Sequence, residues 1–297
     1  NGMKSLRECV MEARVSGKAV GHFNISNLEG FWAIARAAKE LNVPVIIGVS
    51  EGERDFVGVK QAAALVKSLQ NDPFDSAQDR QEIFLNADHT YSFDRVKEAI
   101  DAGYDAVIFD GSKLPLDENI AETKKCVEYA RASGRDVLVE SEIGYIGTSS
   151  KVLSELPEGV SLEEKDLPSA EEAASFAKAT GIDLLAPAVG NIHGMFKVGG
   201  DPALQIGLIK KVSESTGLPL VLHGASGNTD ADIQAAIAAG VAIVHVNTEL
   251  RVAYRDGLKL SLQESPDEVA PYKILKLALV AMQKVVTAKL KLFNGLS

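Results

Sequence analysis

Histidines stand at the ends of three apolar runs, where they could hold a metal ion. His89 closes the run EIFLNADH, His193 follows DLLAPAVG, and His223 follows PLVL. Three imidazoles that meet at one point, with a fourth coordination position left open, are typical of catalytic zinc sites. One such histidine alone is usually a hydrogen-bonded core residue, as we expect for His22. Three together predict a metal centre, with zinc as the first candidate.

Acidic residues accompany these histidines. Asp88 directly precedes His89, and neighbours on a regular strand point to opposite faces, so both can serve one site only if the strand curls away. Asp88 is then either a general base beside the metal or a partner that holds an imidazole. Glu140 and Glu142 lie two residues apart and should share a face. They predict an alternative metal position, an acceptor behind the ligands, or a salt-bridged layer.

A glycine-containing segment, HGASG at 223–227, is suited to bind phosphate because it links an apolar run to a helix-like stretch. The backbone amides of such a turn, with the hydroxyl of Ser226, can cradle an anion at a helix N-terminus. An ordinary tight turn would use the same glycines. Other polar residues at or near the ends of the runs extend the candidate substrate site: Asn24, Ser50, Lys197, His245, Asn247 and Thr248.

The elements that must position these residues alternate along the chain. Short β-branched runs are each followed by a polar turn and an Ala-, Lys- and Glu-rich stretch with helical period. Eight such runs occur, at 19–25, 44–50, 82–89, 106–112, 136–144, 183–190, 219–226 and 242–249. Near-continuous apolar strands indicate burial on both faces, and eight units fit a closed barrel better than an open sheet. We therefore predict an α/β fold, a (β/α)8 barrel forming one domain over residues 1–297.

Three segments stand outside this repeat. Residues 71–81 are strongly polar and predict an exposed loop, and residues 145–169 form a long connection that is a candidate lid. Residues 272–293 are amphipathic and predict a C-terminal helical extension. This helix packs either on its own barrel, which we favour, or on a neighbouring subunit.

Charge and composition limit the partners. The net charge is −10 with a pI near 5.1, which disfavours binding to nucleic acid or anionic membranes. No apolar run approaches the roughly 18 residues needed to span a bilayer, and the first residues do not read as a signal peptide. Cys9 and Cys126 lack the spacing of a metal or disulfide motif and are expected to be buried. We expect a cytoplasmic protein.

Five segments together resemble the class II, metal-dependent fructose-bisphosphate aldolases and their tagatose-bisphosphate relatives. They are NADHT at 86–90, ESEIGYIG at 140–147, AVGNIHGMFK at 188–197, LHGASG at 222–227 and NTELR at 247–251. The resemblance runs nearly end to end. It implies a lyase that reversibly cleaves fructose 1,6-bisphosphate into dihydroxyacetone phosphate and glyceraldehyde 3-phosphate, with zinc polarising the C2 carbonyl. Tagatose 1,6-bisphosphate is the alternative substrate.

The resemblance also implies roles for single residues. It makes His89, His193 and His223 the zinc ligands, places Glu142 in a more buried alternative metal position, and makes Asp88 the group that exchanges the proton of the C4 hydroxyl. Asn24 would contact substrate, Ser50 one phosphate, and the other phosphate would be bound by Gly194, Lys197, Gly224, Ser226 and Thr248. A monovalent cation, Na⁺ or K⁺, near the phosphate loops and a homodimeric or homotetrameric assembly are also implied.

Two departures from the family pattern lie close to the reacting carbons. The stretch GTSSKVLSE has Thr148, Ser149 and Ser150 near the place where many relatives carry a loop glutamate, so the acid is Glu155 or another group. His245 stands where relatives tend to have asparagine and either alters specificity or adds a metal ligand. The competing functions are a zinc hydrolase, which would need no paired phosphate subsites, and a non-catalytic sugar-phosphate binder.

Overall fold

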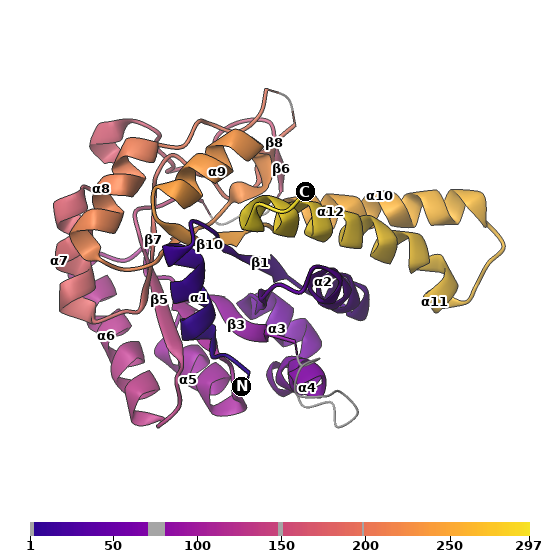
Figure 1. Ribbon diagram of the computed structural model, residues 1–297, viewed down its shortest axis with the longest axis horizontal. Coiled ribbons are helices and arrows are strands. Elements are labelled where there is room, and N and C mark those ends of the chain that lie inside the picture. The colour runs from indigo at the N-terminus through magenta and orange to yellow at the C-terminus, as the bar shows by residue number, and fades with distance from the viewer. Residues whose placement is uncertain (1–2, 71–80, 148–150, 198) are drawn as a thin grey trace.

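Eight parallel strands close into a barrel in the computed structural model, which describes residues 3–70, 81–147, 151–197 and 199–297 (Figure 1). The strands follow one another around the barrel in the order β1-β10-β9-β7-β5-β4-β3-β2. Their bounds are Val20–Asn24 (β1), Val45–Val49 (β2), Ile83–Thr90 (β3), Ala106–Phe109 (β4), Leu138–Ile143 (β5), Leu184–Pro187 (β7), Leu220–Leu222 (β9) and Val241–His245 (β10). Each overlaps one of the predicted runs, and the (β/α)8 prediction is confirmed.

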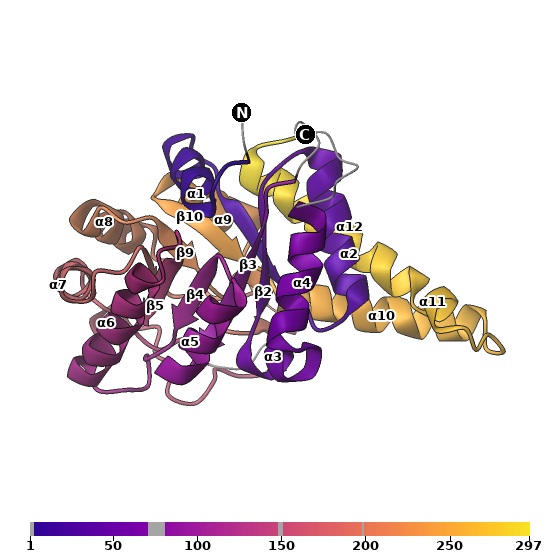
Figure 2. The ribbon, with the colours of Figure 1, turned by 90° about the horizontal axis from the view of Figure 1, so that it is seen from below.

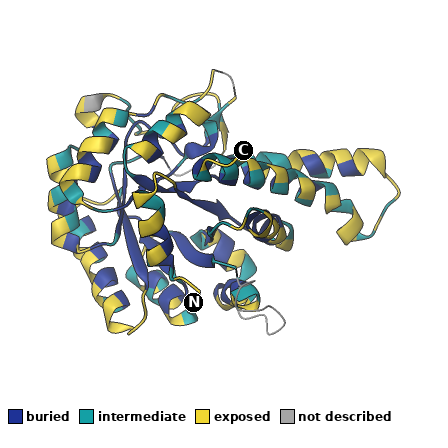
Figure 3. Ribbon diagram, in the orientation of Figure 1, coloured by how far each residue is buried: buried dark blue, intermediate teal, exposed yellow. Residues whose placement is uncertain are grey.

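Helices surround the barrel with their buried faces toward it and their exposed faces outward (Figure 3). Those between strands are α2 (Leu28–Leu41), α3 (Glu51–Val57), α4 (Val59–Gln70), α5 (Phe93–Ala102), α6 (Leu116–Ala132), α7 (Ala170–Thr180), α8 (Ile206–Thr216) and α9 (Asp230–Ala238). Local sequence fixes their ends. In α7 the Ser169 and Glu172 side chains form a capping box, and Gly181 ends the helix in the left-handed conformation.

Helix α1 (Leu6–Val15) closes the amino-terminal end of the barrel. Its residues Leu6, Cys9 and Val10 are buried together with residues from the strands, among them Val20 and Ile46. This end is therefore filled by an apolar plug. Chemistry is left to the opposite end, where the strands finish and the loops after them gather, as in other barrels of this type.

The C-terminal helices form an arm. Figures 1 and 2 show α10 (Thr248–Glu264) and α12 (Lys276–Asn294) running side by side away from the barrel, joined by the short α11 (Pro271–Ile274). The second half of α12 returns to the barrel and packs on α2 and β1, where the Phe293 carbonyl accepts a 3.1 Å hydrogen bond from the Ala19 amide. The favoured packing of the predicted 272–293 helix on its own barrel is thus confirmed, with a break at Leu275 that was not predicted.

A two-stranded sheet was also not predicted. Strand β6 (Val152–Leu153) in the long connection after β5 pairs in parallel with β8 (Met195–Phe196), just after His193. The connection is thereby tied to a loop of the site. Residues 148–150 of this candidate lid, and residues 71–80 of the predicted exposed loop, lie outside the described residues. Within the described ranges, we find no helix with the length and apolar character that crossing a bilayer requires.

Candidate active site

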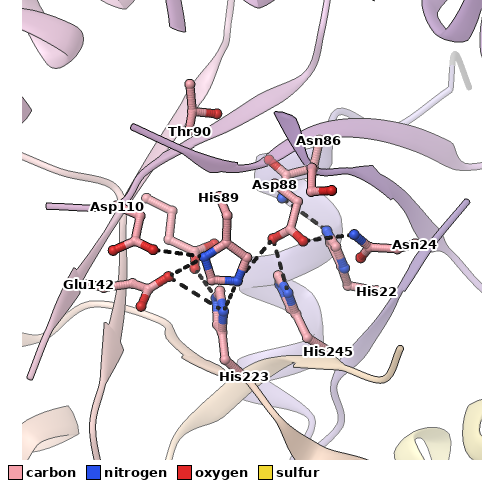
Figure 4. A network of polar contacts seen from close by, with 12 residues as sticks. His22, Asn24, Asn86, Asp88, His89, Thr90, Asp110, Glu142, His223 and His245 are labelled. Carbon is pink, nitrogen blue, oxygen red and sulfur yellow. Dashed lines mark hydrogen bonds and ion pairs between the residues drawn. The ribbon is translucent and has the colours of Figure 1, made fainter. Parts of the chain in front are cut away.

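All five histidines of the chain gather at the carboxyl-terminal end of the barrel, and Figure 4 shows four of them, His22, His89, His223 and His245. The ring centroids of His89 and His193 are 4.6 Å apart, those of His89 and His223 5.0 Å, and those of His193 and His223 5.7 Å. His245 stacks on His223 at 4.1 Å, and His22 stacks on His245 at 3.5 Å. The predicted convergence of three histidines is present, and two further histidines extend it.

His193 reaches the cluster differently from the prediction. Strand β7 ends at Pro187, so His193 belongs to the loop after the strand and not to its end. The loop is held by Asn191, whose side-chain amide donates a 2.9 Å hydrogen bond to the His223 carbonyl, and by the His193 amide, which donates to the Ile146 carbonyl at 2.9 Å. Hydrogen bonds from this loop to Ile146 and to His223 therefore position the His193 imidazole.

An irregular backbone lets Asp88 and His89 serve one site. The pairing of β3 with β4 shifts between Ala87 and Thr90, and His89 has a φ of 35°, in the left-handed region that residues other than glycine rarely adopt. The strand thus departs from regular geometry at Asp88 and His89, as the prediction that both serve one site requires. Backbone strain of this kind persists only where surrounding contacts hold it.

Arg54 supplies such contacts. This residue is only 1% exposed, and its guanidinium forms no ion pair with the described residues. It donates instead to three neutral acceptors: the Val49 carbonyl at 2.6 Å, the Asp88 carbonyl at 3.2 Å and the Thr90 hydroxyl at 3.0 Å. A buried cation without a counter-ion is costly to desolvate. Here it clamps the ends of β2 and β3 on both sides of His89.

Four side chains can share one metal ion. Ligand atoms from His89, Glu142, His193 and His223 all lie within 4.8 Å of one another. His193 Nε2 is buried and forms no hydrogen bond in the described structure, which a bound cation would explain. Three nitrogens and one carboxylate oxygen are a donor set that suits zinc. The residues present therefore fit the predicted metal.

Carboxylates hold the imidazoles from behind. His223 Nε2 lies 2.7 Å from Glu140 Oε1, so Glu140 serves as the predicted acceptor behind the ligands. His89 Nδ1 lies 3.0 Å from Asp110 Oδ2 and 3.0 Å from Glu142 Oε1. Asp110 was missed by sequence reasoning, although an aspartate at the end of the fourth predicted strand was a usable signal. Such partners fix the orientation of a metal-binding imidazole.

Burial and charge set the protonation states. Burial lowers the pKa of His193 and of His245 well below the ordinary value for imidazole. For Asp88 burial acts toward a higher pKa, but the adjacent imidazoles of His89 and His22 outweigh it and hold the pKa below its usual range. The Asp88 carboxylate is therefore ionised at neutral pH and able to accept a proton.

Asn24 orients this carboxylate. Its amide donates 2.8 Å hydrogen bonds to Asp88 Oδ2 and to Glu53 Oε2. Glu53 in turn accepts from the Ser50 hydroxyl at 2.9 Å and from Arg251 at 2.8 Å. Glu53 was not singled out in the sequence because its contacts come from three separate segments. Asn24, predicted as a substrate contact, thus also orients Asp88, and Ser50 contacts Glu53 behind it.

One cavity joins the histidines to the predicted phosphate loops. It is lined by Asn24, Asp88, His89, His193, Gly194, Gly224, Ser226, His245, Asn247 and Thr248. Ser226 lies in the short turn Ala225–Gly227, and its hydroxyl accepts a hydrogen bond from the Glu249 amide in the first turn of α10. Lys197 is exposed, and neither it nor Ser50 lines this cavity.

Replacing Gly224 by alanine should disrupt the phosphate side of the cavity. Gly224 has a φ of +63°, and an added Cβ would lie 1.9 Å from the Ile192 carbonyl oxygen. We expect the free energy of unfolding to fall by about 2–4 kcal/mol and the KM for a phosphorylated substrate to rise. Gly217, with a φ of +67° and no atom within 4 Å of the added Cβ, is the matched control. The free energy of unfolding of Gly217→Ala, measured with denaturant, should fall by only about 1 kcal/mol. Equal losses would contradict the steric argument.

Comparison with known proteins identifies the family. The family model described as fructose-bisphosphate aldolase class-II matches residues 4–296. The fructose-bisphosphate aldolase of Staphylococcus aureus strain Mu50 is 38% identical over 291 residues, covering 98% of this chain and 96% of that protein. The chain belongs to the class II fructose-bisphosphate aldolase family. The probable fructose-bisphosphate aldolase of Bacillus subtilis strain 168 is likewise 38% identical, over 98% of this chain and 97% of its own length.

Solved structures of aldolases share the fold of this class II aldolase. The YdjI aldolase from Escherichia coli K12 superposes with a TM-score of 0.77 at 28% identity, covering 98% of this chain and 97% of that one. A putative fructose-1,6-bisphosphate aldolase from Coccidioides immitis gives a TM-score of 0.79 at 27% identity, over 97% and 96% of the two chains. The chain is accordingly an enzyme of the lyase class, which sets aside the hydrolase alternative.

Proposed function

We propose that this class II aldolase reversibly cleaves fructose 1,6-bisphosphate into dihydroxyacetone phosphate and glyceraldehyde 3-phosphate. The observation that supports it best is one cavity in which an ionised aspartate lies beside a candidate metal site and next to two glycine-containing loops. The names of the relatives favour fructose over tagatose as the sugar.

The proposed cofactor is one zinc ion per subunit. His89, His193 and His223 would hold it, with Glu142 available for a more buried position. A bound zinc ion supplies positive charge that polarises the C2 carbonyl of the substrate. A monovalent cation, Na⁺ or K⁺, near the phosphate loops is part of the same proposal.

The remaining steps belong to side chains. Asp88 takes the proton from the C4 hydroxyl during cleavage and returns it during condensation, held in place by the Asn24 amide. Gly194, Gly224, Ser226, Asn247 and Thr248 line the cavity where one phosphate would bind. For Lys197 and Ser50, which lie outside this lining, a phosphate contact rests on the sequence resemblance alone.

We further propose a homodimer or homotetramer in the cytoplasm, in which the barrel and its C-terminal helices act as one domain. The arm exposes apolar side chains, notably Val269 at 84% and Tyr272 at 76%, and Leu260 and Leu262 are also exposed. Exposed apolar groups of this size are commonly covered by a partner subunit. Small sugar phosphates, and neither nucleic acid nor membrane, are the proposed ligands.

Chelation provides the direct test. Release of dihydroxyacetone phosphate from fructose 1,6-bisphosphate is measured before chelation, after it, and after zinc is restored. We expect chelation to abolish release and zinc to restore it, because no lysine is needed for the chemistry proposed. A release that survives complete removal of metal would rule out the proposed mechanism, and no release in any state would rule out the proposed substrate.

A further inference from the structure

Two imidazoles lie face to face beside Asp88. His22 of β1 and His245 of β10 are direct partners in the parallel pairing of these strands, so both side chains point to the barrel interior. Their ring planes are 1° apart, with centroids separated by 3.5 Å (Figure 4). His22 is fully buried and His245 is 6% exposed. His22 is the hydrogen-bonded core residue that the sequence predicts, with Nε2 3.0 Å from the Asn86 side-chain amide, and the stack on His245 is a further contact.

The surroundings fix the His245 ring. His223 directly follows β9, the neighbouring strand on the other side of β10, and stacks on His245 at 4.1 Å with planes 21° apart. Behind the pair, β2 has a glycine: a Cβ at Gly48 would lie 2.1 Å from His22 Cε1. Glycine at position 48 therefore leaves the space that the His22 ring occupies. His245 is held between two rings, and only its edge is free to meet a ligand.

Metal binding by this pair is disfavoured by its geometry. Ligand atoms of His22, Asp88 and His245 lie within 4.8 Å of one another, as a metal site would require. An imidazole nitrogen, however, directs its lone pair in the plane of its ring, and two parallel stacked rings cannot both direct lone pairs at one ion. The pair is better suited to hydrogen bonding than to coordination.

The edge of His245 has hydrogen-bonding capacity that the described residues leave unused. His245 Nε2 and Asp88 Oδ1 are both buried without a hydrogen bond. His245 Nδ1 lies 3.7 Å from Asp88 Oδ1, too far for a direct bond but close enough for one hydroxyl group beside both atoms to bond to each. An imidazole nitrogen can donate or accept a hydrogen bond, so the edge of the His245 ring can pair with such a hydroxyl.

We propose that His245 contacts the C4 hydroxyl of the ketose bisphosphate and distinguishes its two configurations, and that His22 is a positioning residue that fixes the His245 ring by stacking. This inference rests on the proposed function, since it takes Asp88 as the group that handles the same hydroxyl. Fructose and tagatose 1,6-bisphosphates are epimers at C4. One epimer would satisfy the fixed imidazole edge and Asp88 together, and the other would leave a buried polar group unpaired. Such a mismatch typically gives about 5- to 100-fold discrimination.

The test compares kcat/KM for the two epimers in the zinc-loaded wild type and three variants. His245→Phe keeps an aromatic ring between His22 and His223 but removes both nitrogens, so the ratio of the two kcat/KM values should move at least about fivefold toward one. His22→Ala frees the ring and should move the ratio in the same direction. His22→Phe retains a stacking partner and should restore much of the discrimination. Zinc content by atomic absorption should be unchanged in all three.

The outcomes separate this inference from the proposed function. A wild type that cleaves neither epimer contradicts the proposed function itself. If it cleaves them but His245→Phe and His22→Ala lower both rates equally, the ratio is unchanged and the inference is wrong while the function stands. If His22→Phe is as impaired as His22→Ala, stacking is not the role of His22. Loss of zinc from His22→Ala would show that the residue supports the metal site instead.

Discussion

Replacing Asp88 by asparagine should lower fructose 1,6-bisphosphate cleavage by about 10²- to 10⁴-fold while zinc remains bound. Asparagine keeps the size of the side chain and can still meet the Asn24 amide, which donates to Asp88 Oδ2 at 2.8 Å. It cannot accept the C4 hydroxyl proton. The residue is outside the group of four that offers ligand atoms together with His89. Steady-state kcat and metal content, measured on the same preparation, check the two parts of the prediction.

Asp105 offers a matched control for this change. It also carries a carboxylate, partly buried just before β4 begins, which accepts a 2.9 Å hydrogen bond from the Leu85 amide. This position is at the end of the barrel away from the histidines. Asp105→Asn should therefore reduce stability at most and leave kcat near the wild-type value. Turnover of Asp88→Asn within a few fold of wild type would remove Asp88 as the base.

Replacing His223 by alanine should abolish tight zinc binding. The imidazole lies within 4.8 Å of the other candidate ligand atoms, and its Nε2 is held by Glu140 at 2.7 Å. Loss of a partner behind a ligand already costs about 10- to 100-fold in metal affinity, and loss of the ligand itself should cost more. Equilibrium dialysis against zinc, with protein and metal measured separately, gives the affinity.

Glu140→Gln tests the assignment of His223 as a zinc ligand through the residue that holds its Nε2. Glutamine keeps the shape of the side chain and a hydrogen bond to His223 but removes the negative charge, so we expect a weaker loss of zinc affinity than in His223→Ala. A full equivalent of tightly held zinc in His223→Ala would show that the three-histidine assignment is wrong. A lower zinc affinity in His223→Ala than in Glu140→Gln would therefore distinguish the ligand, His223, from the residue that orients it, Glu140.

The fold was predictable because its signal is local and repeated. Runs such as PVIIGVS and DVLVESEIG combine β-branched residues with strand length, and each is separated from the next by a helix-like stretch. The barrel then follows from their number. The position of His193 was less predictable, because its loop is fixed by a hydrogen bond from Asn191 to His223, which comes from another βα unit.

Residues that support the site were harder to predict than those that face substrate. Asp88, His89 and His223 end apolar runs, which is a pattern visible in one segment. Arg54 lies in an exposed-looking helix sequence, SEGERDFVG, and nothing there indicates that its guanidinium is buried against Asp88 and Thr90. The stack of His22 on His245 likewise depends on the pairing of the first barrel strand with the last. Such contacts become visible only once the barrel is closed.

The place of α12 bears on how the protein is made. Strand β1 emerges from the ribosome early, yet the helix that covers it, α12, is synthesised after every other barrel element. The apolar surface of β1 and α2, including Phe23, must therefore wait for Phe293 and its neighbours through most of translation. Nascent chains that stop before α12 would expose this surface, and we expect them to need chaperone protection that the finished chain does not.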